Sequence, residues 1–162
     1  MEASAPFVPA SFDPPTRLVD AAFVLEPLGP RHNTSDYDAW TSSLAHIRAT
    51  PGFPWGDWPH EMSLAENLAD LEMHERDFEN RTGFTYTVLD PESDRVIGCL
   101  YVYPLRRRDD DGRAAEPIAG AASVRSWVRG DRAALDETLW RAVSDWLEAE
   151  WPFERIEYAA RD

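Results

Sequence analysis

Hydrophobic residues near the C-terminus change their spacing twice along the chain. Residues 121–129 (AASVRSWVR) are rich in small, β-branched and aromatic side chains, which is typical of a buried strand. Residues 136–150 instead place apolar side chains at helical spacing, namely Leu139, Ala142, Val143, Trp146 and Leu147. After Pro152, residues 153–160 (FERIEYAA) favour a strand again. The pattern predicts a strand, a crossover helix and a second strand, and such strands are almost always parallel.

The first half of the chain predicts one strand and two helices. Residues 23–28 (FVLEPL) have the apolar spacing of a strand. A helix capped by Thr34 or Ser35 would follow, and its predicted buried stripe is Tyr37, Trp40, Leu44 and Ile47. Ser63 and Glu66 have the spacing of a capping box that opens a second helix. The predicted buried face of that second helix is Leu64, Leu68, Leu71 and Phe78.

The middle of the chain adds two strands and a polar connection. Residues 84–89 and 96–103 favour strands, joined by a turn-rich link of hairpin length. Residues 106–120 (RRRDDDGRAAEPIAG) predict a long exposed connection to the strand at 121–129. The predicted order is therefore β, α, α, β, β, β, α, β. It indicates a mixed α/β fold in which antiparallel N-terminal strands precede a C-terminal parallel βαβ unit.

The N-terminal segment differs from the rest in composition. Four prolines within residues 1–22 predict an extended arm, ordered where Phe7, Val8 or Phe12 docks on the body. Residues 23–162 predict a single domain, and 162 residues suffice for one sizeable core.

The chain is strongly acidic, with a formal net charge of -14 at pH 7. Such a surface repels nucleic acid and anionic membranes, so neither is an expected partner. It would attract cationic ligands such as amines, although a solvated acidic surface that aids solubility explains the charge equally well.

Neither disulfide nor metal chemistry is expected. Cys99 is the one cysteine, and His32, His46, His60 and His74 lack the spacing of metal ligands. The N-terminus has no basic region followed by an apolar run, which argues against a secretion signal. No apolar run approaches the ~18 residues of a membrane span. The sequence therefore predicts a soluble cytoplasmic protein.

The predicted order and three stretches resemble the GNAT superfamily of acyl-CoA-dependent N-acetyltransferases. FVLEPLGPRHNTSDYDAW is similar to the opening strand and helix of that family, and DPESDRVIGCLYVYP to its antiparallel pair. SVRSWV, the following helix and WPFERIEYAA are similar to its cofactor-binding strand, helix and partner strand. The resemblance covers about residues 23–160. It implies a GNAT-like sheet truncated after the fifth strand, because the chain stops at Asp162.

The resemblance also implies where acetyl-CoA would bind. In the family, the central strand and the next strand diverge, and the pantetheine arm lies between them. The main chain of Trp127, Val128 and Arg129 would line this gap here, and the Val128 N–H would stabilise the developing oxyanion. Arg132 opens the segment that corresponds to the family's pyrophosphate loop. Leu135 and Glu137 replace the small residues of that loop.

Acidic residues at the start of the C-terminal helix leave CoA binding open. Asp136 and Glu137 put negative charge where a phosphate would lie, and they can cap the helix instead. A like-charge contact there would oppose pyrophosphate by about a few kcal/mol. Arg129, Arg132 and Arg141 could offset it by approaching the phosphates from the side.

The resemblance leaves the acid and the base unassigned. Many family members use a Glu on the central strand as base, and Ser123 stands at that position. Others use a Tyr beyond the next strand as acid, in a segment that this sequence lacks. Tyr103 is an alternative candidate acid, although packing also explains it. The edge at residues 153–160 would need cover from the arm or from a second subunit in a homodimer.

A loop rich in aromatic residues is the candidate acceptor site. Trp55 and Trp58 could hold an amine by cation–π contact, with Tyr101 from the neighbouring strand orienting it. Clamping the Pro-rich loop onto the body is the alternative role of both tryptophans. Cys99 is not expected to be a nucleophile, and His60 and His74 are expected to be exposed rather than bases.

Two functional hypotheses follow. The first is an N-acetyltransferase that moves an acetyl group from acetyl-CoA to a primary amine of a small molecule or peptide, without a metal. The second is a catalytically degenerate GNAT-fold protein that binds a ligand or a partner protein. The altered pyrophosphate loop and Ser123 favour the second hypothesis, whereas the strand–helix–strand unit favours the first. A generic α/β domain with a superficial resemblance is a third interpretation.

Overall fold

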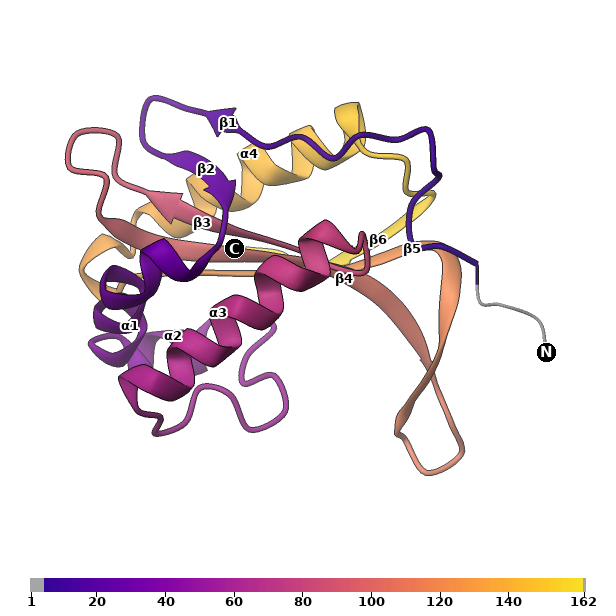
Figure 1. Cartoon of the computed structure of the whole chain (residues 1–162), viewed down its shortest axis with the longest axis horizontal. Coiled ribbons are helices and arrows are strands. Elements are labelled where there is room, and N and C mark those ends of the chain that lie inside the picture. The colour runs from indigo at the N-terminus through magenta and orange to yellow at the C-terminus, as the bar shows by residue number, and fades with distance from the viewer. Residues whose placement is uncertain (1–4, 162) are drawn as a thin grey trace.

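The computed structural model describes residues 5–161, and within them a six-stranded sheet forms the centre of the molecule (Figure 1). The strands lie in sequence order, and all neighbours are antiparallel except β5 and β6, which are parallel. Their bounds are β1 (Leu18–Val19), β2 (Val24–Pro27), β3 (Phe84–Leu89), β4 (Val96–Arg108), β5 (Ala114–Val128) and β6 (Arg155–Tyr158). The predicted mixed α/β fold with a parallel C-terminal unit is confirmed.

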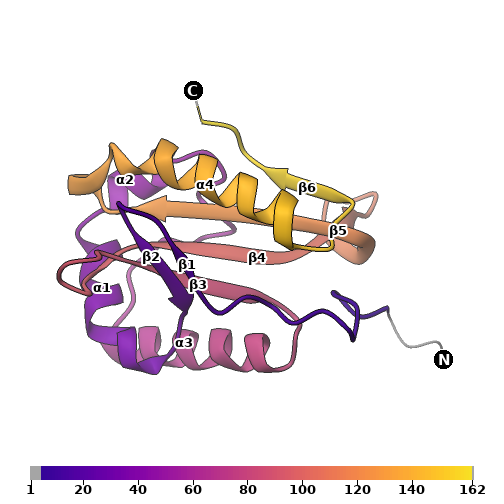
Figure 2. The ribbon, with the colours of Figure 1, turned by 90° about the horizontal axis from the view of Figure 1, so that it is seen from above.

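Helices cover both faces of the sheet (Figures 1 and 2). One face carries α1 (Asn33–Thr41), α2 (Leu44–Ala49) and α3 (Leu64–Glu79), and the other carries α4 (Leu135–Glu150). Single 3₁₀ turns, η1 (Pro30–His32) and η2 (Gly130–Arg132), precede α1 and α4. The sheet therefore has one apolar layer on each face.

Helix α4 forms as its apolar spacing predicts. Leu139, Val143, Trp146 and Leu147 are buried against the sheet. The main chain then returns to pair β6 beside β5, with Ala121 opposite Arg155 and Val124 opposite Tyr158. This crossover fixes the beginning of α4 next to the C-terminal end of β5.

The first predicted helix is two helices in the structure. Ser35 does not cap it, because its hydroxyl accepts a hydrogen bond from the Val96 N–H at 2.9 Å. The helix breaks at Ser42 and Ser43, whose hydroxyls bond main-chain groups of Ala39 and Gly130. Serine side chains that compete for main-chain partners in this way interrupt helices.

Helix α3 has the predicted capping box but a different buried face. Ser63 and Glu66 exchange main-chain to side-chain hydrogen bonds at 3.1 Å. Leu64, predicted to be buried, is 43% exposed, and Asn67 is buried in its place. Asn67 is buried because its side chain accepts a hydrogen bond from the Trp40 Nε1 and donates one to Asp36.

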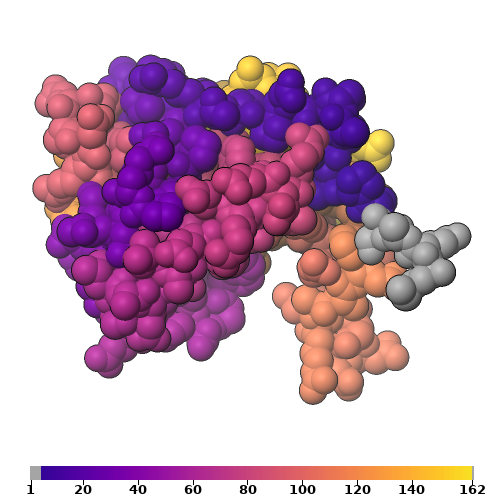
Figure 3. Space-filling view, viewed as in Figure 1, coloured from indigo at the N-terminus to yellow at the C-terminus, as the bar shows by residue number. Residues whose placement is uncertain are grey.

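Residues 106–120 are mostly exposed, as predicted, but they belong to two paired strands rather than to a separate connection. Strands β4 and β5 continue through these residues as a hairpin, with Arg106 opposite Pro117 and Arg108 opposite Ala114. The hairpin projects from the body as a separate arm of the molecule (Figure 3). Main-chain hydrogen bonds around the turn at Asp109 and Gly112 hold this hairpin together. Its sequence lacks the alternating apolar residues that would have indicated two strands.

The described part of the N-terminal arm docks on the body. Val8 is buried, and the Phe7 ring stacks on Phe84 and on Phe153. Residues 1–4 of the predicted arm and Asp162 lie outside the described residues. Within residues 5–161, strand β6 has β5 as its one neighbour, so cover of its other edge by a second subunit stays a prediction.

Candidate active site

Strands β5 and β6 separate toward their C-terminal ends. Their pairing stops where Val124 lies opposite Tyr158, yet β5 continues to Val128. The Arg129 N–H donates to the Ile97 carbonyl of β4 at 2.8 Å. Because main-chain groups alternate along a strand, Trp127 also faces β4, and Ser126 and Val128 face the opening. Of the three residues expected to line the gap, only Val128 presents its main chain to it. We call this opening the wedge.

An arginine side chain fills the wedge. Arg161 is buried, and its Nε donates to the Asp136 carboxylate at 2.7 Å. Its Nη2 donates to the Ser126 carbonyl at 2.9 Å and its Nη1 to the Ala159 carbonyl at 2.8 Å. The Tyr158 hydroxyl bonds to the Ser126 hydroxyl beside it. The carbonyl that a pantetheine arm would need is therefore occupied by a guanidinium group.

The start of α4 has no side-chain cap. Ala134 is at the N-cap position, and neither Asp136 nor Glu137 bonds the first main-chain amides. Asp136 pairs with Arg161, and Glu137 pairs with Arg141 at 2.6 Å. The alternative that these acids cap the helix is therefore wrong. Uncapped amides at a helix start are available to an anion, although the acidic side chains stand close by.

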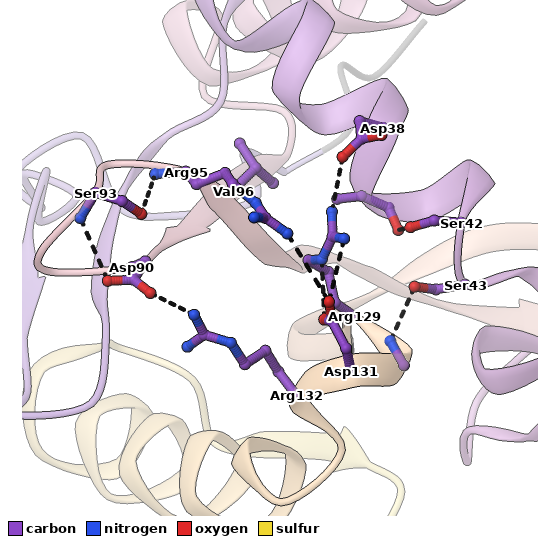
Figure 4. Close-up of polar contacts among 12 residues, drawn as sticks. Asp38, Ser42, Ser43, Asp90, Ser93, Arg95, Val96, Arg129, Asp131 and Arg132 are labelled. Carbon is purple, nitrogen blue, oxygen red and sulfur yellow. Dashed lines mark hydrogen bonds and ion pairs between the residues drawn. The ribbon is translucent and has the colours of Figure 1, made fainter.

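Two of the three arginines expected to approach the phosphates, Arg129 and Arg132, form ion pairs with acidic residues (Figure 4). Arg129 bonds Asp38 at 2.9 Å and Asp131 at 3.0 Å, and it lowers the pKa of Asp131. Arg132 donates to Asp90 at 2.6 Å. The pKa of Asp90 is lowered first by the main-chain N–H of Glu92 and then by Arg132. The Arg132 side chain is 45% exposed and the Asp90 side chain 13%, so a phosphate that takes Arg132 leaves Asp90 with the N–H groups of Glu92 and Ser93 as its donors.

A cavity of about 430 Å³ lies on the face of the sheet opposite α4, between α1, α3 and the loop at 50–60. We call it the aromatic pocket. It brings together Trp55, Trp58, Tyr101 and Tyr103, which the sequence nominated for substrate or catalysis. Its remaining lining residues are Leu28, Asp36, Trp40, Asn67, Asp70, Leu71, Met73 and His74.

Asp36 is the most deeply buried charge of the aromatic pocket. Its side chain accepts a hydrogen bond from Asn67 Nδ2 at 3.1 Å. Burial raises the pKa of Asp36 to about 6, and the nearby Asp70 carboxylate adds to that rise. The carboxylate is therefore mainly ionised at pH 7, in surroundings of low polarity.

His74 has a defined hydrogen-bonding arrangement in the same pocket, which corrects the expectation that it is exposed. The Tyr103 hydroxyl donates to Asp77 at 2.8 Å, and His74 Nδ1 lies 2.9 Å from both the Tyr103 and the Thr85 hydroxyl oxygens. Burial lowers the pKa of His74 to about 4, so the ring is neutral at pH 7. Tyr103 is thus held by Asp77 and His74, and burial raises its pKa.

Ser123 supports an arginine. Its hydroxyl accepts from Arg125 Nη1 at 2.9 Å, and the Arg125 guanidinium lies 4.5 Å from the centre of the Trp55 ring. Trp55 is therefore held by a cation on one face while it lines the aromatic pocket. This hydrogen bond gives Ser123 a structural role in positioning the pocket loop.

Trp127 packs behind the aromatic pocket. Its buried indole donates to the Tyr101 hydroxyl at 3.0 Å and lies 6.2 Å from the Trp58 ring. Cys99 lies under the same layer, and burial raises its pKa well above the usual value. A buried, protonated thiol is not a nucleophile, as the sequence predicted.

Four residues of the site were missed or misplaced by the sequence: Asp36, Asp70, His74 and Arg161. Asp36 lies four positions before Trp40, and His74 lies three after Leu71, so each shares a helix face with a buried residue. A polar residue on an apolar stripe is the signal that could have found them.

Within residues 5–161 no group of three or more His, Cys, Asp or Glu side chains is arranged to hold a metal ion. None of the helices in the described part of the chain is long and apolar enough to cross a membrane.

Comparison with solved structures identifies the fold. The ribosomal-protein-S5-alanine acetyltransferase from Vibrio fischeri matches with a TM-score of 0.58 and 13% identity, over 81% of this chain and 66% of that one. RimL, a ribosomal L7/L12 α-N-protein acetyltransferase in complex with coenzyme A, matches with a TM-score of 0.64 and 14% identity, over 87% and 72%. The microcin C7 self-immunity acetyltransferase MccE, in complex with acetyl-CoA and AMP, matches with a TM-score of 0.57 and 10% identity, over 80% and 62%.

These likenesses show that the chain has the GNAT fold, as the sequence predicted. The chain spans about two thirds of the length of these structures. No protein-family model matches the sequence, and no curated protein matches it.

Proposed function

We propose that the protein is an N-acetyltransferase that transfers an acetyl group from acetyl-CoA to a primary amine. The wedge is the observation that supports the proposal most strongly. Strand β5 extends four residues beyond its last β6 partner and directs the main chain of Ser126 and Val128 into the opening. The uncapped start of α4 lies next to it. The GNAT-fold structures that contain coenzyme A or acetyl-CoA make this ligand the natural candidate.

The residues of the wedge fit the two halves of acetyl-CoA unequally. On the thioester side, the Val128 N–H faces the opening and needs no particular side chain to do so, but the pantetheine arm has to displace Arg161 from the Ser126 carbonyl. The pyrophosphate half requires two ion pairs to open, Arg161 with Asp136 and Arg132 with Asp90. Phosphate oxygens could then replace the Asp90 carboxylate as the partner of Arg132, whereas Arg161 has to leave the wedge.

The proposed reaction is a direct transfer. The neutral amine nitrogen forms a bond to the thioester carbonyl carbon, and the Val128 N–H stabilises the oxyanion. The nitrogen releases its extra proton to water, and the C–S bond breaks. The CoA sulfur takes a proton, and we assign its donor to Tyr158, whose hydroxyl lies at the wedge beside Ser126 and regains a proton from water. Burial raises the pKa of Tyr158, so the hydroxyl is protonated at neutral pH. Ser123 and Tyr103 face the opposite layer and are not proposed as this acid.

Calorimetric titration with acetyl-CoA tests the proposal. Clearing the wedge with the double substitution Arg161→Ala and Asp136→Ala leaves the net charge unchanged, and we expect it to tighten binding at least about tenfold. The matched control is Arg155→Ala with Glu157→Ala, which removes an exposed ion pair of β6 and should leave affinity unchanged. Absence of binding at millimolar acetyl-CoA in both the native and the cleared chain would refute the transferase proposal.

A second candidate function is a ligand-binding protein without acyl transfer. The specific observation in its favour is the Arg161 side chain, which satisfies both the Ser126 carbonyl and Asp136. If acetyl-CoA binds neither chain while the aromatic pocket binds a ligand, this second function is the better account.

A further inference from the structure

The walls of the aromatic pocket are mainly indole and phenol rings. Trp40, Trp55, Trp58, Tyr101 and Tyr103 line it, and Trp55 is 39% exposed. The volume of about 430 Å³ lies within the range of small-molecule sites. Aromatic faces attract cations and also pack against apolar groups, so such walls suit a ligand that carries both.

The charges that line the pocket have one sign. Asp36 and Asp70 contribute carboxylates, and among the described residues that line it there is no Arg or Lys. His74 is neutral at pH 7 because burial lowers its pKa to about 4. An ammonium ion therefore meets attraction in this cavity, and a carboxylate or phosphate meets repulsion.

Asp36 lacks a counter-ion. Its side chain is 4% exposed, and Asn67 donates to Oδ2 alone. Within residues 5–161, the Asp36 carboxylate forms no ion pair. The groups that face it are Asp70 on α3 and Cys99 and Tyr101 on β4, none of them a cation. A buried carboxylate without a cation is costly, and a ligand ammonium would remove that cost.

We propose that the aromatic pocket selects hydrophobic primary amines that carry no carboxylate, with the ammonium group at Asp36 and Asp70 and the apolar body against Trp55 and Trp58. This inference deepens the proposed function, because it names the class of acceptor. Binding itself needs no acetyl-CoA and can therefore be measured separately.

The same features exclude amino acids as ligands. A free amino acid brings a carboxylate that finds no arginine or lysine among the pocket residues and faces Asp36 and Asp70 instead. A neutral alcohol of the same shape as the amine packs against the aromatic walls but leaves the Asp36 carboxylate without a cation. Discrimination among these three ligands is therefore the signature of the proposal.

The test is calorimetric titration of the full chain, without acetyl-CoA, with 2-phenylethylamine, 2-phenylethanol and phenylalanine at pH 7.5. The amine is expected to bind at least about tenfold more tightly than either analogue, which corresponds to about 1.4 kcal/mol. Equal binding of the alcohol, or no binding of the amine at millimolar concentration, would overturn the proposal. Tighter binding of a short peptide with a free N-terminus would also overturn the assignment to small amines.

Variants connect the binding to named residues. Asp36→Asn keeps the shape of the side chain and is expected to lose at least about tenfold in affinity for 2-phenylethylamine but little for 2-phenylethanol. The control is Asp145→Asn, an exposed acid on α4, which should change neither affinity. Should the Asp36 variant not fold, Trp55→Ala at the exposed ring is expected to weaken both ligands. Unchanged amine affinity in Trp55→Ala would contradict the proposed position of the ligand.

Discussion

Asp36 shows how one residue can link stability to binding. It lies on the buried side of α1, four positions before Trp40, at a place where an apolar side chain would be ordinary. Its spacing was visible in the sequence, whereas its partner Asn67 comes from another helix, and that contact is set by how α1 and α3 pack. Local patterns do not contain such long-range contacts. The sequence therefore indicated Trp55 and Trp58 as site residues but not Asp36.

We predict that Asp36→Asn stabilises the protein at neutral pH. The pKa of Asp36 is about 6 in the folded state, above its usual 3.8, so the folded state holds this proton more tightly than the unfolded chain. The stabilisation due to Asp36 is thus present below pH 3.8 and is lost as pH rises through 6. At pH 7 the variant should gain about 3 kcal/mol at most.

Urea denaturation of the native protein and of the Asp36→Asn variant between pH 4 and 7 measures the difference in their free energies of unfolding. The gap in the free energy of unfolding should grow as pH rises and should be close to zero near pH 4, about the usual pKa of an aspartate. A gap that does not depend on pH would show that the Asp36 carboxyl titrates normally.

At the scale of elements, the strand–helix–strand unit was predictable and the details of the wedge were not. Small and β-branched residues define β5, and the apolar stripe defines α4. The reach of β4 and β5 into the projecting hairpin was missed because residues 106–120 have no apolar period, although Asp111 and Gly112 form a typical turn pair. The Arg161 side chain enters the wedge through tertiary packing, which no spacing reveals.

The close packing of β4 on β5 predicts an effect for Gly98→Ala. A Cβ atom at Gly98 would lie 2.5 Å from the Trp127 carbonyl oxygen, so the two strands would have to move apart. We expect a loss of about 1–3 kcal/mol in the free energy of unfolding. Gly130→Ala is the matched control, because its Cβ would lie 3.5 Å from the nearest atom, His46 Cβ. Equal stability of both variants in thermal denaturation would refute the tight packing.

The wedge also predicts the effect of Tyr158→Phe on acetyl transfer. If Tyr158 gives a proton to the leaving sulfur, the variant should lose about 10²-fold in kcat. The affinity for acetyl-CoA in calorimetry should stay the same, since the ring remains in place. A change in affinity with unchanged kcat would assign Tyr158 to binding instead.

At the scale of the whole molecule, the wedge and the aromatic pocket are two separate sites. The wedge opens at the β5 edge beside α4, and the aromatic pocket lies under α1 and α3. The order of elements was enough to predict the fold, whereas a cationic ligand, which the acidic composition suggested, stays a prediction. The sequence did not decide whether CoA binds. In the structure Arg129 and Arg132 are each paired with an acid that is distant in the sequence, and local spacing does not reveal such pairs.

The most direct measurement is acetyl transfer itself, followed by mass spectrometry of a mixture of the full chain, acetyl-CoA and 2-phenylethylamine. The account predicts N-acetyl-2-phenylethylamine and one free CoA thiol for each amide formed, with little product from phenylalanine. Amine binding without any acetylated product, in both the native chain and the chain cleared at Arg161 and Asp136, would contradict it.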